Sequence, residues 1–195
     1  MWQSTDLKGK KIAIQGLGSV GAKLAHLLFW EGAELILTDL DHETLKEMCL
    51  LYGAKQARPE EIFDTHCDIF APCALGGILR ADIIPRLHCK AVAGSANNQL
   101  RERKDGELLM QRGILHAPGF AINAGGIINV SCEFDPGGYN PRKARDKIER
   151  IFHTLTTIFK SADLEKRPPT AVADELAEYK LMHGIGKRQK PLAFV

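Results

Sequence analysis

Residues 11–21 read KIAIQGLGSVG. The run Ile12-Ala13-Ile14 is apolar and of strand length, and three glycines follow it at the spacing G-x-G-x-x-G. From Val20 onward apolar residues recur at helical spacing, and Gly32 predicts the end of that helix. A glycine-rich turn between a buried strand and a helix is typical of a βαβ unit that binds phosphate groups at the helix N-terminus.

Each glycine of this turn has a separate physical role in such a unit. Gly16 permits the tight strand-to-helix turn, Gly18 lets the backbone approach a pyrophosphate, and Gly21 allows the helix to pack closely on the strand. The free N–H groups and the dipole of the helix start, where Ser19 and Val20 stand, attract the negative charge. The turn therefore predicts a dinucleotide-binding domain of Rossmann type.

An acidic residue follows at the expected distance. Asp39 ends a second predicted strand, Leu35-Ile36-Leu37, and its carboxylate would accept hydrogen bonds from the adenosine ribose, with Leu40 beside it. A carboxylate would repel a 2′-phosphate, and no Arg or Lys stands between Asp39 and Lys46 to bind one, so the sequence favours NAD over NADP. These residues alone leave open FAD, S-adenosylmethionine, or glycines that serve packing only.

The rest of the chain extends the same architecture. After the helix of residues 42–52, the pattern predicts a parallel sheet covered on both faces, which is the doubly wound α/β class. Residues 141–161 and 170–183 predict C-terminal helices, so residues 1–140 form the expected Rossmann domain and residues 141–195 pack on it. Further strands are expected at residues 54–57, 67–71, 91–93 and 114–116, and a helix at residues 101–112.

Composition narrows the function classes. A net charge of +2 provides no electrostatic basis for nucleic-acid or membrane binding, and no apolar run has membrane-spanning length. Five cysteines without a CxxC motif, and no secretory signal at the N-terminus, favour reduced thiols in the cytoplasm. The repeated pairs His66-Cys67 and His88-Cys89 could bind a metal, but each precedes a buried strand, so we expect packing and no metal site.

Three further segments contain small and amide residues that packing does not explain. They are PCALGG at residues 72–77, AGSANNQL at residues 93–100 and APGFAINAGG at residues 117–126. Together with GLGSVG they resemble the glutamate, leucine, phenylalanine and valine dehydrogenases, most closely the leucine/phenylalanine/valine branch. The resemblance covers about residues 6–180 and implies NAD-dependent oxidative deamination of a branched-chain or aromatic L-amino acid to the 2-oxo acid and ammonia.

The resemblance also implies site residues. Cys73, Ala74 and Leu75 would flank the adenosine and its ribose, and Asn97 would approach the nicotinamide ribose. Asn123 would hold the nicotinamide carboxamide and face the substrate, a task that suits an amide because it both donates and accepts hydrogen bonds. A turn or a helix cap is the alternative role for each asparagine.

The chain departs from the family at two positions. Gly119 stands where the family usually has an acid, and Ala121 stands where valine is frequent, near the substrate side chain. The smaller Ala121 would widen that wall, so we expect a preference for a bulkier amino acid.

The family's catalytic lysines and aspartate lie on an N-terminal domain with a GGGK segment, and nothing here resembles that segment. We therefore assign no catalytic residue to this chain and expect NAD binding without turnover by the chain alone, with exposed apolar surface driving homo-oligomer formation. A non-catalytic NAD-binding regulatory module is the alternative. A short-chain reductase is disfavoured because the only Tyr-x-x-x-Lys pair, Tyr139 and Lys143, follows Gly137-Gly138, away from any strand-flanked helix.

Overall fold

The computed structural model describes residues 6–135 and 137–184, and its described part contains a six-stranded parallel sheet. The strand order is β3-β2-β1-β4-β5-β6, so β1 lies between β2 and β4. This parallel α/β arrangement confirms the predicted Rossmann-type fold. The strands are β1 (Lys11–Gln15), β2 (Glu34–Thr38), β3 (Lys55–Gln56), β4 (Ile69–Pro72), β5 (Ala91–Val92) and β6 (Leu115–His116).

Helices and turns cover both faces of the sheet. Alternation along β1 sends Ile12 and Ile14 into a core beneath α1 (Ser19–Trp30) and α2 (His42–Tyr52). Ala13, between them, joins a second core with Phe70 and Leu109, beneath η1 (Ile62–Asp64), η2 (Ile84–Arg86) and α3 (Asp105–Gln111). Burial on both faces explains why the strands are apolar throughout.

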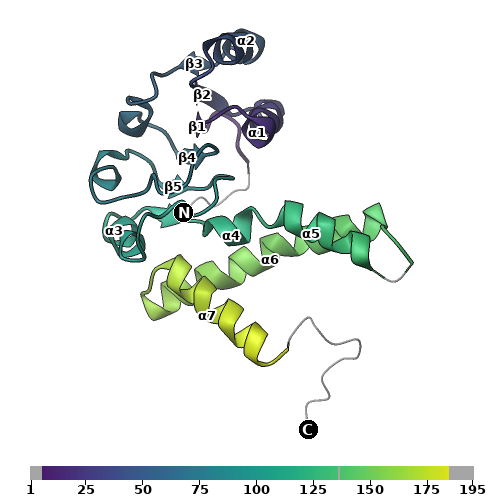
Figure 1. The fold of residues 1–195 in the computed structure, drawn as a ribbon. Coiled ribbons are helices and arrows are strands. Elements are labelled where there is room, and N and C mark those ends of the chain that lie inside the picture. Colours follow the sequence, from purple (N-terminus) through teal and green to yellow (C-terminus); the bar gives the residue numbers. More distant parts are fainter. Residues whose placement is uncertain (1–5, 136, 185–195) are drawn as a thin grey trace.

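The chain then forms a helical layer beside the β6 end of the sheet (Figure 1). It comprises α4 (Gly119–Ile122), α5 (Gly125–Ser131), η3 (Cys132–Phe134), α6 (Pro141–Glu165) and α7 (Pro169–Met182). Asn140 begins α6 as an N-cap, since its side chain accepts hydrogen bonds from the backbone of Arg142 and Lys143. Ile158 and Val172 form the small core between α6 and α7. Among the described residues, no helix combines the length and apolar character of a membrane span.

Several predicted boundaries were wrong. The helix expected at residues 101–112 begins only at Asp105, because the preceding residues form turns. The helix expected to end at Ser161 continues to Glu165. Thr170 does not cap the last helix, which begins at Pro169, where proline's fixed φ suits the first turn. Part of the predicted C-terminal region, residues 185–195, lies outside the described residues.

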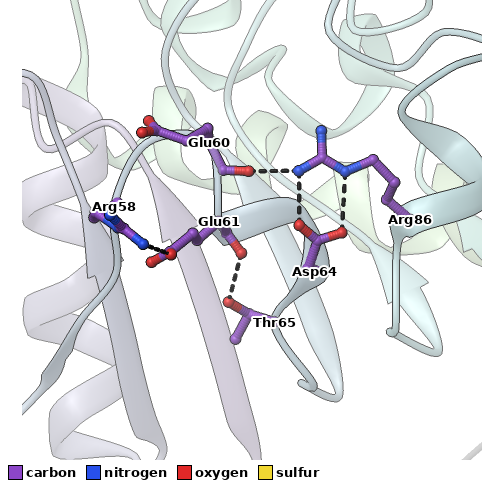
Figure 2. Close-up of polar contacts among 6 residues, drawn as sticks. All are labelled: Arg58, Glu60, Glu61, Asp64, Thr65 and Arg86. Atoms are coloured by element: carbon purple, nitrogen blue, oxygen red, sulfur yellow. Dashed lines mark hydrogen bonds and ion pairs between the residues drawn. The ribbon is translucent and has the colours of Figure 1, made fainter.

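An ion-pair network joins residues 58–65, which lie between β3 and β4, to Arg86 in η2, which precedes β5 (Figure 2). Arg86 donates from Nε and Nη2 to the Asp64 carboxylate at 3.0 and 2.7 Å, and from Nη2 to the Glu60 carbonyl at 2.6 Å. The Arg86 guanidinium lowers the pKa of Asp64 by hydrogen bonding. Arg58 pairs with Glu61 on the same segment. The network ties residues 58–65 to η2.

The two His-Cys repeats lie side by side just before β4 and β5. A parallel bridge joins His66 to His88, and their rings stack with centroids 4.4 Å apart. Cys67 and Cys89 pack against the second core, and hydrogen bonding to Cys89, together with burial, raises the pKa of Cys67. Within the described residues no group of three or more His, Cys, Asp or Glu side chains is placed to hold a metal ion.

Candidate dinucleotide-binding site

The loops that carry the predicted site meet at the carboxyl edge of the sheet. Because β1 lies between β2 and β4, the glycine turn has the loop of residues 39–41 on one side and residues 73–77 on the other. The chain crosses from β1 to β2 in one direction and later returns to β4 on the other side of β1. Such a reversal point forms the crevice in which open α/β sheets bind ligands.

The glycines of the turn have different surroundings. Gly16 has φ +95°, and a Cβ there would lie 2.8 Å from the Ala74 Cβ. A Cβ on Gly21 would lie 2.0 Å from the Gly16 carbonyl oxygen, so close packing requires this glycine. At Gly18 a Cβ would meet nothing within 4 Å. Protein packing therefore does not explain Gly18, whereas a phosphate group lying against its backbone would.

Among the described residues, no side chain caps the start of α1. Gly18 is its N-cap and offers no side-chain hydrogen bond to the first turn. The first turn contains no acidic residue, and Ser19 and Val20 are exposed there. The first N–H groups of a helix have no intrahelical acceptor, so a pyrophosphate fits this terminus.

Asp39 contacts the glycine turn directly. Its Oδ2 accepts a hydrogen bond from the Leu17 backbone N–H at 2.5 Å, and its Oδ1 accepts one from Asp41 N–H at 2.8 Å. A carboxylate offers about four acceptor positions, so capacity remains for ribose hydroxyls. The residue expected to bind the ribose thus also holds the phosphate-binding turn, a role that spacing alone did not predict.

Exposed apolar side chains lie on either side of the glycine turn. Leu40 follows β2 and Leu75 follows β4, and each is 81% exposed. Cys73 is anchored through its backbone N–H, which donates to the Gln15 carbonyl at 2.7 Å. Two buried side-chain oxygens at this edge, Gln15 Oε1 and Thr38 Oγ1, have no hydrogen-bond partner in the described part of the chain. Polar capacity and apolar surface together fit the adenosine end of a dinucleotide.

Small residues bring the next two loops into backbone contact. A Cβ on Gly76 would lie 2.3 Å from the Asn97 carbonyl oxygen, and one on Gly94 would lie 2.2 Å from the Pro72 carbonyl oxygen. The Ala96 N–H also donates to the Pro72 carbonyl at 2.8 Å. The PCALGG and AGSANNQL segments therefore form one surface.

The two predicted asparagines lie together at the far end of this surface. Asn123 is the C-cap of α4, and its Nδ2 donates to the Ser95 carbonyl at 2.7 Å and to Asn97 Oδ1 at 2.8 Å. The Asn123 side-chain N–H₂ group thus donates to both partners, and its Oδ1 takes part in neither hydrogen bond. Asn123 Oδ1 and Asn97 Nδ2 form no hydrogen bond among the described residues, so the pair keeps one acceptor and one donor for a ligand.

Ala121 lies on the other side of α4. It packs against the core of α6 and α7 and lines a cleft of about 240 Å³, whose walls include Ile128, Ile151 and Leu176. Ala124, which directly follows Asn123 in the chain, also lines this cleft. Gly119, the other position at which the chain departs from the family, lies against the segment of residues 93–100. A Cβ on Gly119 would lie 3.0 Å from the Ala96 carbonyl oxygen.

The sequence did not predict a buried pair of polar side chains, Gln99 and His116, close to the asparagine loops. Gln99 and His116 are each 2% exposed, and His116 Nε2 lies 3.1 Å from Gln99 Oε1. Gln99 Nε2 donates to the Gly94 carbonyl at 2.8 Å, and His116 Nδ1 lies 3.1 Å from Thr170 Oγ1 on α7. A polar residue at the end of a buried strand, as His116 is in β6, was the available signal.

The fold defines a Rossmann-type α/β domain, and comparison with known sequences defines its family. The family model for glutamate/leucine/phenylalanine/valine dehydrogenases matches residues 36–167. The chain therefore belongs to this family of amino-acid dehydrogenases.

Individual relatives agree with that assignment. Leucine dehydrogenase of Thermoactinomyces intermedius is 45% identical over 90% of this chain and 47% of the relative. L-tryptophan dehydrogenase of Nostoc punctiforme is 40% identical over 98% of this chain and 54% of the relative. Its crystal structure superposes with a TM-score of 0.89, over 93% of this chain and 54% of that one. A hetero-hexameric glutamate dehydrogenase from Thermus thermophilus, 22% identical with a TM-score of 0.63, shares the fold. The chain spans about half the length of these relatives.

Proposed function

We propose that this chain is the NAD-binding half of a dehydrogenase that oxidatively deaminates a branched-chain or aromatic L-amino acid to its 2-oxo acid and ammonia. The observation that carries the proposal is Gly18, whose Cβ position is empty of protein contacts at the start of a helix with free N–H groups. The carboxylate of Asp39, beside the turn, favours a ribose whose 2′-hydroxyl is free. This supports NAD as the cofactor.

The site residues would act by binding and orientation. Gly18, Ser19, Val20 and Gly21 would surround the pyrophosphate with backbone N–H groups. Gly16, whose own N–H donates to the Thr38 carbonyl, would form the tight turn that places them. At one end Asp39, Leu40, Cys73, Ala74 and Leu75 would hold the adenosine. At the other end Asn97 and Asn123 would present the nicotinamide, which when bound supplies the hydride acceptor of the reaction.

The Asn123 hydrogen bonds support its proposed role. Its Nδ2 is held by Ser95 and Asn97, so its Oδ1 would accept from the carboxamide N–H₂ group of the nicotinamide. Fixing the nicotinamide ring in this way would determine which face meets the substrate. Positioning of this kind lowers the barrier to hydride transfer because reacting atoms meet in one geometry.

We further propose a bulky substrate side chain. This proposal rests on the sequence expectation that Ala121, smaller than the valine frequent at this position, lies near the substrate side chain. In the structure Ala121 lines the cleft between α4, α6 and α7. The presence of an L-tryptophan dehydrogenase among the relatives supports a large aromatic substrate. In enzyme reconstituted with the complementary half of a relative, we expect phenylalanine or tryptophan to be preferred to valine. A strong preference for valine would contradict this part of the proposal.

The catalytic acid–base groups would come from the part of the relatives that this chain does not span. The described residues near Asn123 offer amides and small side chains, with no lysine among the asparagine contacts. We therefore propose that residues 1–140 form the cofactor domain and that the C-terminal helices pack on it. We also propose that the chain alone binds the cofactor without turnover. Measurable oxidation of leucine or phenylalanine by the purified chain would overturn this expectation.

The helical layer also supports a proposal of self-association. Phe134, Phe152 and Leu181 are exposed on it, and apolar surface of this kind drives association in water. We expect a concentration-dependent increase in mass by sedimentation. A chain that stays monomeric at high concentration would contradict this proposal.

Calorimetric titration with NAD and NADP tests the central proposal. We expect NAD to bind and NADP to bind more weakly. Asp39→Asn keeps an acceptor for Leu17 N–H but removes the charge, so NAD affinity should fall about tenfold and the preference over NADP should shrink. Asp163→Ala, an exposed carboxylate on α6, is the matched control and should change neither affinity. Tight NADP binding without NAD binding would refute the cofactor assignment.

A further inference from the structure

A line of four polar groups runs from α7 to the loop before the asparagine pair. Thr170 Oγ1, His116, Gln99 and the Gly94 carbonyl follow one another at 3.1, 3.1 and 2.8 Å. The two middle members are almost completely buried. Buried polar side chains are expensive unless fully paired, so each bond in this line contributes to holding its neighbours.

The carbonyl at the end of the line determines the direction of the first two hydrogen bonds. The Gly94 carbonyl can only accept, so Gln99 must donate from Nε2 and present Oε1 to His116. Gln99 Oε1 can only accept, so His116 must carry a proton on Nε2. If the ring is neutral, His116 Nδ1 is an acceptor and the Thr170 hydroxyl donates to it. The geometry thus requires an Nε2–H donor, and the surroundings of the ring decide its charge.

The surroundings of His116 keep it neutral. Burial lowers the pKa of His116 to about 4, because desolvation disfavours the charged ring. The adjacent cleft, lined by Arg101, Glu102, Arg103 and Phe120, contributes charged groups of both signs. At neutral pH the imidazole therefore remains an Nε2–H donor.

The line ends next to the groups that the proposed function assigns to the nicotinamide. Gly94 and Ser95 are consecutive residues, and the Ser95 carbonyl accepts from Asn123 Nδ2. Asn123 in turn donates to Asn97. Fixing the Gly94 peptide thus fixes the turn whose next carbonyl orients Asn123.

We propose that His116, acting through Gln99, is a positioning residue for the nicotinamide end of the site and that the line couples α7 to that end. The inference rests on the proposed function, since the asparagines matter here only if they hold a dinucleotide. It also predicts that the adenosine end, built by the glycine turn and Asp39, is independent of His116.

The test compares two ligands in the purified chain. ADP occupies only the adenosine and pyrophosphate part of the site, whereas NAD also reaches the asparagines. His116→Phe fills the same space without a hydrogen-bond donor. In this variant NAD affinity should fall about fivefold, which corresponds to the loss of one oriented hydrogen bond, while ADP affinity should stay within about twofold. His116→Gln places an amide donor near the position of Nε2 and should restore NAD affinity.

The outcomes separate this inference from the proposed function. Absence of NAD binding by the unmodified chain would contradict the proposed function. An unchanged ratio of NAD to ADP affinity in His116→Phe, an equal loss for both ligands, or failure of His116→Gln to rescue would overturn the positioning role alone.

A spectroscopic measurement keeps the inference testable if His116→Phe does not fold. Nitrogen-15 NMR of the unmodified chain should show His116 as the neutral Nε2–H tautomer, and Thr170→Val should shift its Nδ1 resonance while the chain stays folded. The Nδ1–H tautomer, or a ring that is charged at pH 6, would contradict the direction of the line.

Discussion

The glycine turn and the helical layer are held together by different kinds of contact. Around β1 the important contacts involve backbone and small residues, as where Gly21 lies against the Gly16 carbonyl. In α4–α7 the important contacts involve large apolar side chains, and only part of that surface is buried, as Ile158 in the core and Phe152 outside it illustrate. The first region is complete within the chain, whereas the second presents surface with no partner among the described residues.

Because the two regions are held by different kinds of contact, we expect ligand binding to depend on the glycine turn and folding stability to depend on the helical layer. A site made of backbone N–H groups tolerates no added atoms at particular glycines, and its function can fail without loss of folding. A layer made of apolar side chains loses stability when volume is removed, but its loss need not reach the glycine turn. Substitutions in each region can test that separation.

The largest effect should come from a pair of glycines in the same turn. Gly21→Ala forces a Cβ against backbone and should lower the free energy of unfolding by about 3 kcal/mol or more. Gly18→Ala meets no protein atom and should change it by less than about 0.5 kcal/mol, yet weaken NAD binding at least about tenfold. Urea unfolding and calorimetric titration measure both quantities. NAD binding unchanged in Gly18→Ala would show that no phosphate lies against that residue.

The second test concerns the helical layer. Ile158 is 2% exposed, so Ile158→Ala should cost about 3 kcal/mol of stability through the lost burial and the cavity left behind. ADP affinity at the glycine turn should stay within about twofold. Leu164→Ala on the same helix is the control, because Leu164 is exposed and its removal should be nearly neutral. A large fall in ADP affinity in Ile158→Ala would show that the two regions are not separable.

The third test uses pH at the boundary between the regions. His116 has a folded pKa of about 4, below the value of an unfolded histidine, so the unfolded chain binds more protons between these values. Stability should therefore fall on acidification, by roughly 2 kcal/mol from pH 7 to pH 5 for this group. His116→Gln should lack that part of the pH dependence in urea titrations at the two pH values. An identical slope in both proteins would mean that His116 titrates normally.

The smallest effect should come from the ion pairs that join residues 58–65 to η2. Asp64 is half exposed, so Asp64→Asn should shift the urea midpoint only slightly at pH 7, and less again in high salt. Arg86 lowers the pKa of Asp64, so the contribution of this pair is present above the unfolded pKa and disappears as pH falls through the folded one. Ligand affinities should not change, because neither residue of the pair belongs to the candidate site.

Local sequence patterns predicted the parallel sheet, the glycine turn and the family, because each depends on short-range periodicity or on spaced glycines. They could not predict which polar groups meet across the fold. The bond between Asp39 and Leu17 N–H, the contact of Asn123 with Asn97, and the contact of His116 with Gln99 join residues 22, 26 and 17 positions apart. The short helix Gly119–Ile122 was missed because four residues show no helical period.

The bond between Asp39 and the Leu17 backbone has a consequence for cofactor engineering. A common way to convert a protein of this class to the phosphorylated cofactor is to replace the acid with a neutral or basic residue. Here an exchange to a residue without a side-chain acceptor, unlike Asp39→Asn, would also release the backbone of the glycine turn. A successful conversion would therefore need a second substitution that supplies a new acceptor for Leu17 N–H, so the two changes should be selected together.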